Sequence, residues 1–344
     1  MPEAVDERTP TVRSPAERSA WLAALASSTE ALAFHTPNWI ASICESGRYT
    51  DASRLYDFGD GRQLILPLVR HRTVPRLIAT AASLPDGWGF GGAVGPGAVR
   101  PDEAASVLAD LGDGAALRTS VRPNPLAAVP SQLPEGLAVT PIQRSAHVLE
   151  LDGDFEHVER RFSSSARRQV RKADRSSLSV EADSSGRLVS VFYDLYLKSV
   201  ERWTRGRRLP SLARAQLLRR DPLRKFEVVA RRMGDACSIW VAWLDERPAA
   251  AIIVLTQGVN ASYWRGAMDR DLAGPTRANF LLHSRAIEDA CRTGRRNYHM
   301  GETDPNSSLA HFKAHFGAKA HPYVGYRLRP RLRRARRVLR RSRP

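Results

Sequence analysis

Cysteine is scarce in this sequence: Cys44, Cys237 and Cys291 are the three cysteines in 344 residues. They are scattered and odd in number, which excludes a disulfide framework and the paired spacing of a zinc site or a redox motif. This pattern suits a reducing environment, so we expect a cytoplasmic protein without a bound metal.

Long apolar stretches are also lacking. No segment approaches the roughly 20 consecutive apolar residues that a membrane helix needs, and residues 1–20 contain no apolar core of a signal peptide. Hydrophobic residues still make up 42% of the chain, which is enough to bury ordinary cores. The length suits two domains of about 100–150 residues each.

Acidic residues are few relative to basic ones, and the imbalance is concentrated in one segment. The net charge is +17, yet residues 327–344 contain ten arginines and no acid, which leaves +7 for the other 326 residues. Such a dense block of like charge repels itself, so we expect residues 327–344 to be disordered, as we do residues 1–14. The expected partner of this tail is a polyanion, either RNA or the anionic inner face of the plasma membrane, where the tail would tether a peripheral protein. A solubilising tail without a partner is the alternative.

Hydrophobic periodicity and turn residues predict the same order of elements in two halves of the chain, residues 15–143 and residues 144–326. Each half contains helices, an antiparallel strand meander, one amphipathic helix and a returning strand. This order implies an α/β (α+β) protein of two tandem units, each with a mixed, largely antiparallel sheet flanked by helices. The clearest expected elements are helices at 101–112, 186–203, 221–234 and 276–294, a hairpin at 53–69 and a three-stranded meander at 237–268.

Two further features have simple structural interpretations. Asp221 precedes an amphipathic stretch and is expected to cap its helix. The glycine-rich segment 87–97 has the GxGxxG spacing of a nucleotide-binding loop at Gly87, Gly89 and Gly92, but it leads into AVRPDE without an immediate phosphate-binding helix. We therefore expect this segment to form a bulged loop that lines the cleft between the halves, without binding a nucleotide.

Several motifs, in this order of elements, resemble the GNAT acyltransferase fold. They include SSSARRQVRKA at 163–173, the segment 277–304 with its strand ending in Gly-Glu, and HFKAHFGAK at 311–319. The matching stretches span roughly residues 31–326, and the sequence looks like the double-GNAT branch that includes Fem-type peptidoglycan aminoacyltransferases and CelD-like acetyltransferases. The resemblance implies an N-acyltransferase that acts on an amine acceptor, such as a cell-envelope or polysaccharide precursor.

One departure from the GNAT pattern leaves the acyl donor open. In CoA-dependent members, the motif [Q/R]xxGx[G/A] after the fourth strand binds the pyrophosphate with backbone N–H groups. Here that place reads RDLAGPTRANF, in which Arg270 and Gly274 are one residue too far apart and Pro275 lacks the N–H. The donor is therefore either an aminoacyl-tRNA, as the Fem-type resemblance implies, or acetyl-CoA or another acyl-CoA used to modify a sugar amine or a small metabolite. A non-enzymatic RNA-binding protein is the alternative from another class.

Acyl transfer to an amine needs an unprotonated nitrogen, hydrogen-bond donors for the oxyanion and a proton for the leaving group. Glu302, at the exit of a predicted strand, is the first candidate for the general base, and His299 in the same strand is the second. Tyr263 is the candidate proton donor. Chemistry that depends on positioning alone, without a dominant base, is the alternative.

Arginines on two elements are candidates for substrate binding. Arg167 and Arg168 lie on a basic helix and fit a phosphate, with a solvated cationic face as the alternative. Strand alternation predicts Arg265 on the same face as Tyr263, with Trp264 on the other. Arg265 is expected to bind a carboxylate or a phosphate.

Two more candidates lie near predicted helix ends. Asn279, in the first turn of its helix, would contact the donor carbonyl or cap the helix. Lys313 flanks the apolar stripe of a short helix, from which its amine would reach the cleft.

Overall fold

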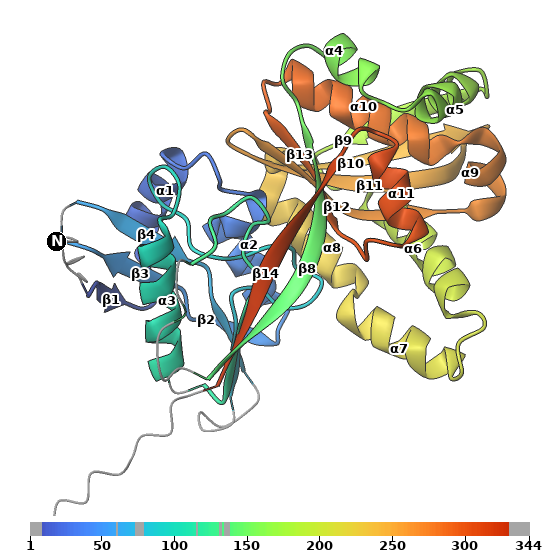
Figure 1. Cartoon of the computed structure of the whole chain (residues 1–344). Helices are drawn as coiled ribbons and strands as arrows, with labels where there is room; N and C mark the ends of the chain where they lie inside the picture. Colours follow the sequence, from blue (N-terminus) through green and yellow to red (C-terminus); the bar gives the residue numbers. More distant parts are fainter. Residues whose placement is uncertain are drawn as a thin grey trace, which may run out of the picture.

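The computed structural model describes residues 9–59, 61–72, 79–114, 116–130, 133 and 138–329. They form a mixed α/β fold around one 11-stranded sheet and one three-stranded sheet (Figure 1). The strands of the large sheet are β2 (Tyr49–Asp51), β5 (Val69–His71), β6 (Thr80–Ala82), β7 (Arg118–Val121), β8 (Val139–Glu150), β9 (Leu178–Asp183), β10 (Cys237–Leu244), β11 (Arg247–Gln257), β12 (Asn260–Met268), β13 (Asn297–Glu302) and β14 (Lys319–Leu328).

The large sheet is mixed and largely antiparallel, which confirms the predicted fold class. Its strand order is β2-β5-β6-β7-β14-β8-β13-β12-β11-β10-β9. Two of its pairings, β6 with β7 and β12 with β13, are parallel. The predicted meander is β10, β11 and β12, and its turns use positive φ angles at Asp245, Glu246 and Gly258.

In the N-terminal half, three helices pack around the strands: α1 (Arg18–Ala26), α2 (Pro37–Glu45) and α3 (Pro101–Asp113). The α3 helix begins at Pro101 because proline suits a first turn, and Glu103 accepts a hydrogen bond from the backbone of Arg100 at 2.8 Å. The predicted hairpin is present as β3 (Arg54–Asp57) and β4 (Gln63–Leu66), which form the small sheet with β1 (Thr11–Arg13). The expected disorder of residues 1–14 therefore does not hold for β1; residues 1–8 lie outside the described residues.

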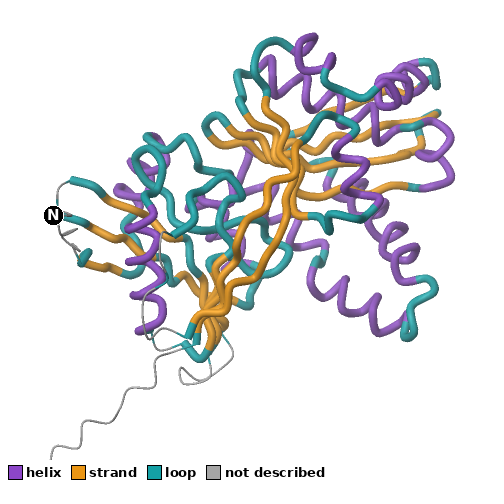
Figure 2. Tube along the Cα trace, viewed as in Figure 1, coloured by secondary structure: helices purple, strands orange, loops and turns teal. Residues whose placement is uncertain are grey.

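The long strands β8 and β14 join the two halves. The β8 strand crosses the predicted boundary between residues 143 and 144, and it pairs with the whole of β14, which also pairs with β7 of the N-terminal half. Figure 2 shows these strands running through the junction. The β14 strand includes Arg327 and Leu328, which belong to the segment 327–344 that we expected to be disordered. Residues 330–344 lie outside the described residues.

The helices of the C-terminal half cover both faces of its sheet (Figure 1). One face carries α6 and α8, which also contacts α2, and the other carries α5 and α10. The α7 helix was not predicted, because it buries no residue and so shows no apolar stripe. In the described part of the chain, no helix combines the length and the apolar character needed to cross a membrane. The helices are α4 (Phe155–Arg160), α5 (Ser164–Asp174), α6 (Val189–Thr204), α7 (Pro210–Arg220), α8 (Leu223–Met233), α9 (Arg270–Thr276), α10 (Ala278–Arg292) and α11 (Ser308–Ala314).

One aromatic core connects the halves. The ring centroids of Trp39 and Trp88, from the N-terminal half, lie 5.1 and 6.2 Å from that of Trp264 in β12. Phe226 of α8 packs against Trp264 at 5.5 Å, and all four rings are buried. Because large aromatic side chains bury much apolar area and prefer such tilted contacts, this core fixes the two halves against each other next to β12.

Candidate active site

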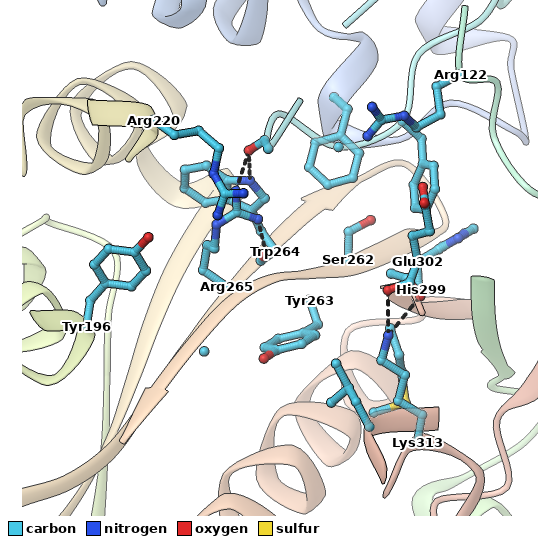
Figure 3. A pocket seen from close by; sticks show the side chains of 18 of the residues that line it. Arg122, Tyr196, Arg220, Ser262, Tyr263, Trp264, Arg265, His299, Glu302 and Lys313 are labelled. Carbon is cyan, nitrogen blue, oxygen red and sulfur yellow. Dashed lines mark hydrogen bonds between the residues drawn. The ribbon is translucent and has the colours of Figure 1, made fainter. Parts of the chain in front are cut away.

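The central strands β12 and β13 separate part-way along their length. They pair in parallel at three positions, the last of which is Ser262 opposite His299. Beyond this point both strands are irregular, because the register shifts at Trp264 in β12 and after His299 in β13. The strands diverge along one side of a cavity of about 330 Å³ (Figure 3).

Five of the eight candidate residues line this cavity: Tyr263, Arg265, His299, Glu302 and Lys313. The glycine-rich loop of the N-terminal half also lines it, as predicted. Gly87 in this loop has a φ of 82°, and a Cβ atom there would lie 2.8 Å from Nη2 of an arginine in β12. The positive φ favours glycine here, because a residue with a Cβ atom is strained in this conformation, whereas the arginine side chain could move aside.

A bulge in β12 changes the direction of two of these side chains. Trp264 and Arg265 both donate hydrogen bonds to the carbonyl of Gly87, at 3.3 and 2.6 Å. Tyr263 points to the other side, where its ring centroid lies 4.7 Å from that of His283. The prediction that Tyr263 and Arg265 share a face is therefore wrong, because the extra residue of a bulge re-aims the side chains next to it.

A buried carboxylate organises one end of the cavity. Asp221 has no exposed surface and accepts hydrogen bonds from Lys225 at 2.7 Å, Arg220 at 2.9 Å and Arg265 at 3.4 Å. The hydroxyl group of Tyr196 donates to the same carboxylate at 3.0 Å. Asp221 was expected to cap α8, but the capping position is the next residue and the Asp221 side chain turns into this cluster, where three cations attract it.

The charges of this cluster do not cancel, since three basic groups surround one acid. Burial alone would raise the pKa of Asp221, but the surrounding cations, Arg265 first, hold it well below its usual range. Burial lowers the pKa of Lys225 to about 7, although Asp221 opposes the shift. The Lys225 ammonium lies 4.1 Å from the ring centre of Trp88. The remaining positive charge favours an anionic group at this end of the cavity.

Arg220 belongs to this cluster and was missed from the sequence. Its Nε atom donates to Asp221 while 45% of its side chain stays exposed, so its position is fixed but it remains accessible to a ligand. It also lines a second cavity of about 340 Å³, whose other basic lining residues are Arg48, Arg118 and Arg219. The one feature of the sequence that points to Arg220 is the pair of arginines directly before Asp221. Nothing in the sequence, however, shows that Asp221 is buried.

Glu302 lies across the cavity from this basic cluster (Figure 3). Its carboxylate forms an ion pair with Arg144 and accepts a hydrogen bond from Tyr323 at 2.7 Å. Burial, and then Glu302, raise the pKa of Tyr323, so its hydroxyl keeps its proton and donates. The candidate base is thus held in place by two partners and is still partly exposed.

Lys313 fixes the end of β13. Its Nζ atom donates to the carbonyls of Gly301 and Glu302, at 2.9 and 3.3 Å, and to the hydroxyl of Thr303. The residue is 2% exposed, and burial lowers the pKa of Lys313 to about 7, although Glu302 opposes the shift. Its amine therefore lines the cavity with its hydrogen bonds already directed at the backbone of the strand.

We expect Lys313→Met to lower the free energy of unfolding by about 2–3 kcal/mol, because buried acceptors lose their donor. The variant should also flatten the pH dependence. The folded pKa of Lys313 is about 7 and that of an unfolded lysine about 10.4, so between these values the unfolded state binds more protons and stability rises with pH. Urea denaturation from pH 7 to 9.5 measures both effects, with Lys319→Met, an exposed lysine, as the control. Equal stability of the two variants at every pH would contradict this role.

Two polar atoms at the point where the strands separate have no hydrogen-bond partner among the described residues: Oγ of Ser262 and Nδ1 of His299. Both residues are 1% exposed. Burial lowers the pKa of His299 to about 3, so its ring is neutral at pH 7. Buried polar atoms are normally satisfied by protein, water or ligand. Both residues line the cavity, so a hydrogen-bond partner for these two atoms would come from water or from a ligand.

The other three candidates do not line the cavity. Arg167 donates to backbone carbonyls after α4, at 2.6 and 2.9 Å, and so stabilises the turn between α4 and α5. Arg168 is exposed on α5. The amide of Asn279 contacts the sulfur of Met268 at 3.0 Å.

The α9 helix occupies the position of a pyrophosphate-binding loop, between β12 and α10. Asp269 caps it: the side chain accepts from the backbone N–H of Asp271 at 3.1 Å, and the carbonyl accepts from that of Ala273 at 2.8 Å. The Asp269 carboxylate forms an ion pair with Lys198 at 2.7 Å and occupies the place where a phosphate would need free backbone N–H groups. Pro275, within the same helix, has no backbone N–H to offer. These residues do not fit a diphosphate.

Residues 160–314 match the sequence family described as the acetyltransferase (GNAT) domain. This stretch contains β12, β13 and most of the cavity wall from the C-terminal half. The fold and the separated strands agree with this match, which supports an acyltransferase with a GNAT-like domain at residues 160–314. Among the described residues, no group of three or more His, Cys, Asp or Glu side chains is placed to hold a metal ion.

Over most of its length the chain has the Fem-like fold that the sequence motifs predicted. It is similar to the crystal structure of FemX, with a TM-score of 0.57 and 11% identity, covering 85% of this chain and 90% of FemX. It is also similar to a conserved protein of unknown function from Bacteroides thetaiotaomicron VPI-5482, with a TM-score of 0.53 and 10% identity, covering 91% and 95% of the two chains. No curated protein sequence matches the chain.

Proposed function

We propose that the protein transfers an acyl or aminoacyl group to an amine acceptor in the cavity between β12 and β13. The observation that carries this proposal is the pair of buried atoms, Oγ of Ser262 and Nδ1 of His299, that lack hydrogen-bond partners at the point where β12 and β13 separate. Excess positive charge lies at one end of the same cavity. The Ser262 hydroxyl can donate to the reacting carbonyl, and the basic end suits an anionic part of a substrate.

The reaction forms a bond between the amine nitrogen and the acyl carbon and breaks the bond from that carbon to the donor oxygen or sulfur. The attacking amine loses a proton and the leaving group gains one. We assign Glu302 as the group that accepts the proton, because its carboxylate is held at the cavity by Arg144 and Tyr323. Burial raises the pKa of Tyr263 to about 12, so its phenol is protonated at neutral pH and suits the role of proton donor.

The other assigned residues bind or position. In neutral His299, Nε2 faces the amide oxygen of Asn260, so Nδ1 is left to accept a hydrogen bond from the attacking amine. The amine of Lys313 holds the strand that carries Glu302. Arg265 and Arg220 receive the carboxylate or phosphate of a substrate. Asn279 remains a candidate for the donor side because it lies in the first turn of α10, next to the end of β12.

For the donor, we propose an aminoacyl ester carried by tRNA. The support is α9, whose capping carboxylate and proline take the place of a phosphate-binding loop. On α5, Arg168, Arg171, Lys172 and Arg175 are exposed and suit an RNA backbone; Arg167 would take part only if it left the carbonyls it now binds. A GNAT fold in general uses acyl-CoA, so an acetyl-CoA-dependent N-acetyltransferase of a sugar amine or metabolite is the second candidate. RNA binding without transfer is the third.

The donor is tested by binding, which needs no knowledge of the acceptor. We expect aminoacyl-tRNA to bind the full chain at least tenfold more tightly than CoA or acetyl-CoA, measured by filter binding and calorimetry at one salt concentration. Replacing Arg168 and Arg171 by glutamine should weaken tRNA binding and reduce its salt dependence, because each phosphate contact releases counterions. Tighter binding of acetyl-CoA, unaffected by these substitutions, would exclude the tRNA donor.

For the acceptor, we propose an amine that carries phosphate, such as a cell-envelope precursor. The support is the second cavity, which adjoins the first through Arg220 and contains three more arginines. We also propose that the arginine-rich tail at 327–344 contacts the anionic inner face of the plasma membrane.

A further inference from the structure

The chain between α6 and α7 exposes apolar side chains at one place on the folded protein. Of nine large apolar side chains that are exposed among the described residues, three fall within ten positions: Trp203 (41%), Leu209 (62%) and Leu212 (53%). We call residues 203–214 the α6–α7 corner. Scattered exposed apolar residues are ordinary, but a cluster of them indicates an interaction surface.

The same corner is strongly basic. Arg205, Arg207, Arg208 and Arg214 are exposed, and residues 203–214 contain no acid. Arg205 has one partner, the exposed Glu201, at 3.5 Å. Basic and apolar side chains therefore occur together in one short exposed segment.

Trp203 packs against Tyr196, with ring centroids 5.9 Å apart, but burial does not explain the two leucines. The α7 helix buries none of its residues, and Figure 1 shows it projecting below the sheet of the C-terminal half. A helix whose residues all stay accessible gains little from packing. Polar residues in place of Leu209 and Leu212 would remove no contact from the core, because both side chains are exposed.

We propose that the α6–α7 corner docks on an anionic phospholipid surface. Its arginines match the negative headgroups, and its tryptophan and leucines match the boundary between headgroups and acyl chains. RNA offers no partner for exposed leucine side chains, so the composition favours lipid. The inference is independent of the acyl donor and of the tail at 327–344.

The α6–α7 corner lies next to the cavity, so docking on a membrane would bring the membrane close to the active site. Trp203 lines the cavity between β12 and β13, and Arg220 at the end of α7 lines both cavities. A membrane bound by the corner would therefore lie beside the mouth of the cavity. An amine presented at the membrane surface would reach the site without leaving the interface.

The test is co-sedimentation of the full chain with vesicles of phosphatidylcholine alone or with 30% phosphatidylglycerol. We expect binding to the anionic vesicles, at least tenfold weaker in the fourfold variant R205Q/R207Q/R208Q/R214Q and in L209S/L212S, since each arginine near an anionic surface contributes about fivefold in affinity. Fluorescence supplies a second readout. Trp203 is the tryptophan that is 41% exposed, so brominated lipid should quench the wild-type chain and not Trp203→Phe.

Matched controls separate the corner from charge in general. R168Q/R171Q/K172Q/R175Q removes four exposed charges from α5, and Leu22→Ser removes an exposed leucine (48%) from α1; both should bind vesicles like the wild type. Thermal unfolding verifies that every variant is folded. Equal loss in the corner and α5 variants, or full binding by the corner variants, would overturn the proposal. Loss of RNA binding with unchanged vesicle binding would assign the corner to RNA and also overturn it.

Discussion

Replacing Asp221 by alanine is expected to lower the free energy of unfolding by about 3–5 kcal/mol, because removing one partner of a buried ion pair leaves the other charge unpaired. Lys225 is 1% exposed and depends on Asp221 for its strongest contact. Arg220 and Arg265 lose the same partner, but they are more exposed than Lys225, so water replaces part of the lost hydrogen bonding. Urea denaturation at pH 7 measures the loss.

Two comparisons identify the cause of this destabilisation. Asp235→Ala removes an exposed acid from the same half and should change stability by less than about 0.5 kcal/mol. The double variant Asp221→Ala with Lys225→Met removes both buried charges and should recover part of the loss. If the double variant is as unstable as the sum of the two single variants, the pair is not coupled and the explanation fails.

The loss should also depend on pH with a defined sign. The pKa of Asp221 is held well below its usual range in the folded state, whereas an unfolded aspartate titrates near about 3.9. The folded state therefore gains from the ionised carboxylate fully above about pH 4, and this gain is lost as pH falls through the folded pKa. The part of the difference between wild type and Asp221→Ala that comes from the carboxylate should therefore shrink below about pH 4.

Arg220→Gln is expected to lower kcat/KM for acyl transfer by about 10- to 100-fold, the effect of losing a hydrogen bond from a charged group to a substrate. Arg220 is positioned by Asp221, is partly exposed and lines both cavities. Initial rates with the donor that binds measure the effect. Since Arg220 is proposed to hold an anionic group in both the ground state and the transition state, most of the change should appear in KM.

The control for this prediction is Arg224→Gln, which removes an exposed arginine of α8 that lines neither cavity. Its kcat/KM should equal that of the wild type within a factor of two. If Arg220→Gln also keeps its kcat/KM, no anionic group of the substrate lies at the basic end of the cavity.

The fold was predictable because its elements are locally encoded. The α8 stripe of Phe226, Val229 and Met233 ends at a glycine, and the meander turns lie at Asp245-Glu246 and at Gly258, so pattern and turn chemistry agree with the structure. The α7 helix was missed because none of its residues is fully buried and its sequence shows no periodicity. The pairing of β14 with both β7 and β8 was also missed, because strand register between distant segments depends on tertiary contacts.

The site was predictable only in part, for a related reason. Tyr263, His299 and Glu302 were found because they lie on the two strands that separate in a GNAT domain. The direction of Arg265 was wrong because the bulge at Trp264 has no local signal. The role of Asp221 was wrong because a carboxylate before a helix is usually a cap, and its burial depends on cations contributed by two other segments.

The placement of β14 has a consequence for synthesis of the chain on the ribosome. Without residues 319–328, the large sheet is divided into β2-β5-β6-β7 and β8-β13-β12-β11-β10-β9, and the edges of β7 and β8 have no neighbour between them. Unpaired strand edges are templates for aggregation, and pairing across some 200 residues, as between β7 and β14, is slow because of its high contact order. Nascent chains released before residue 319 should therefore associate through these edges, while chains that include residue 328 close the sheet on themselves.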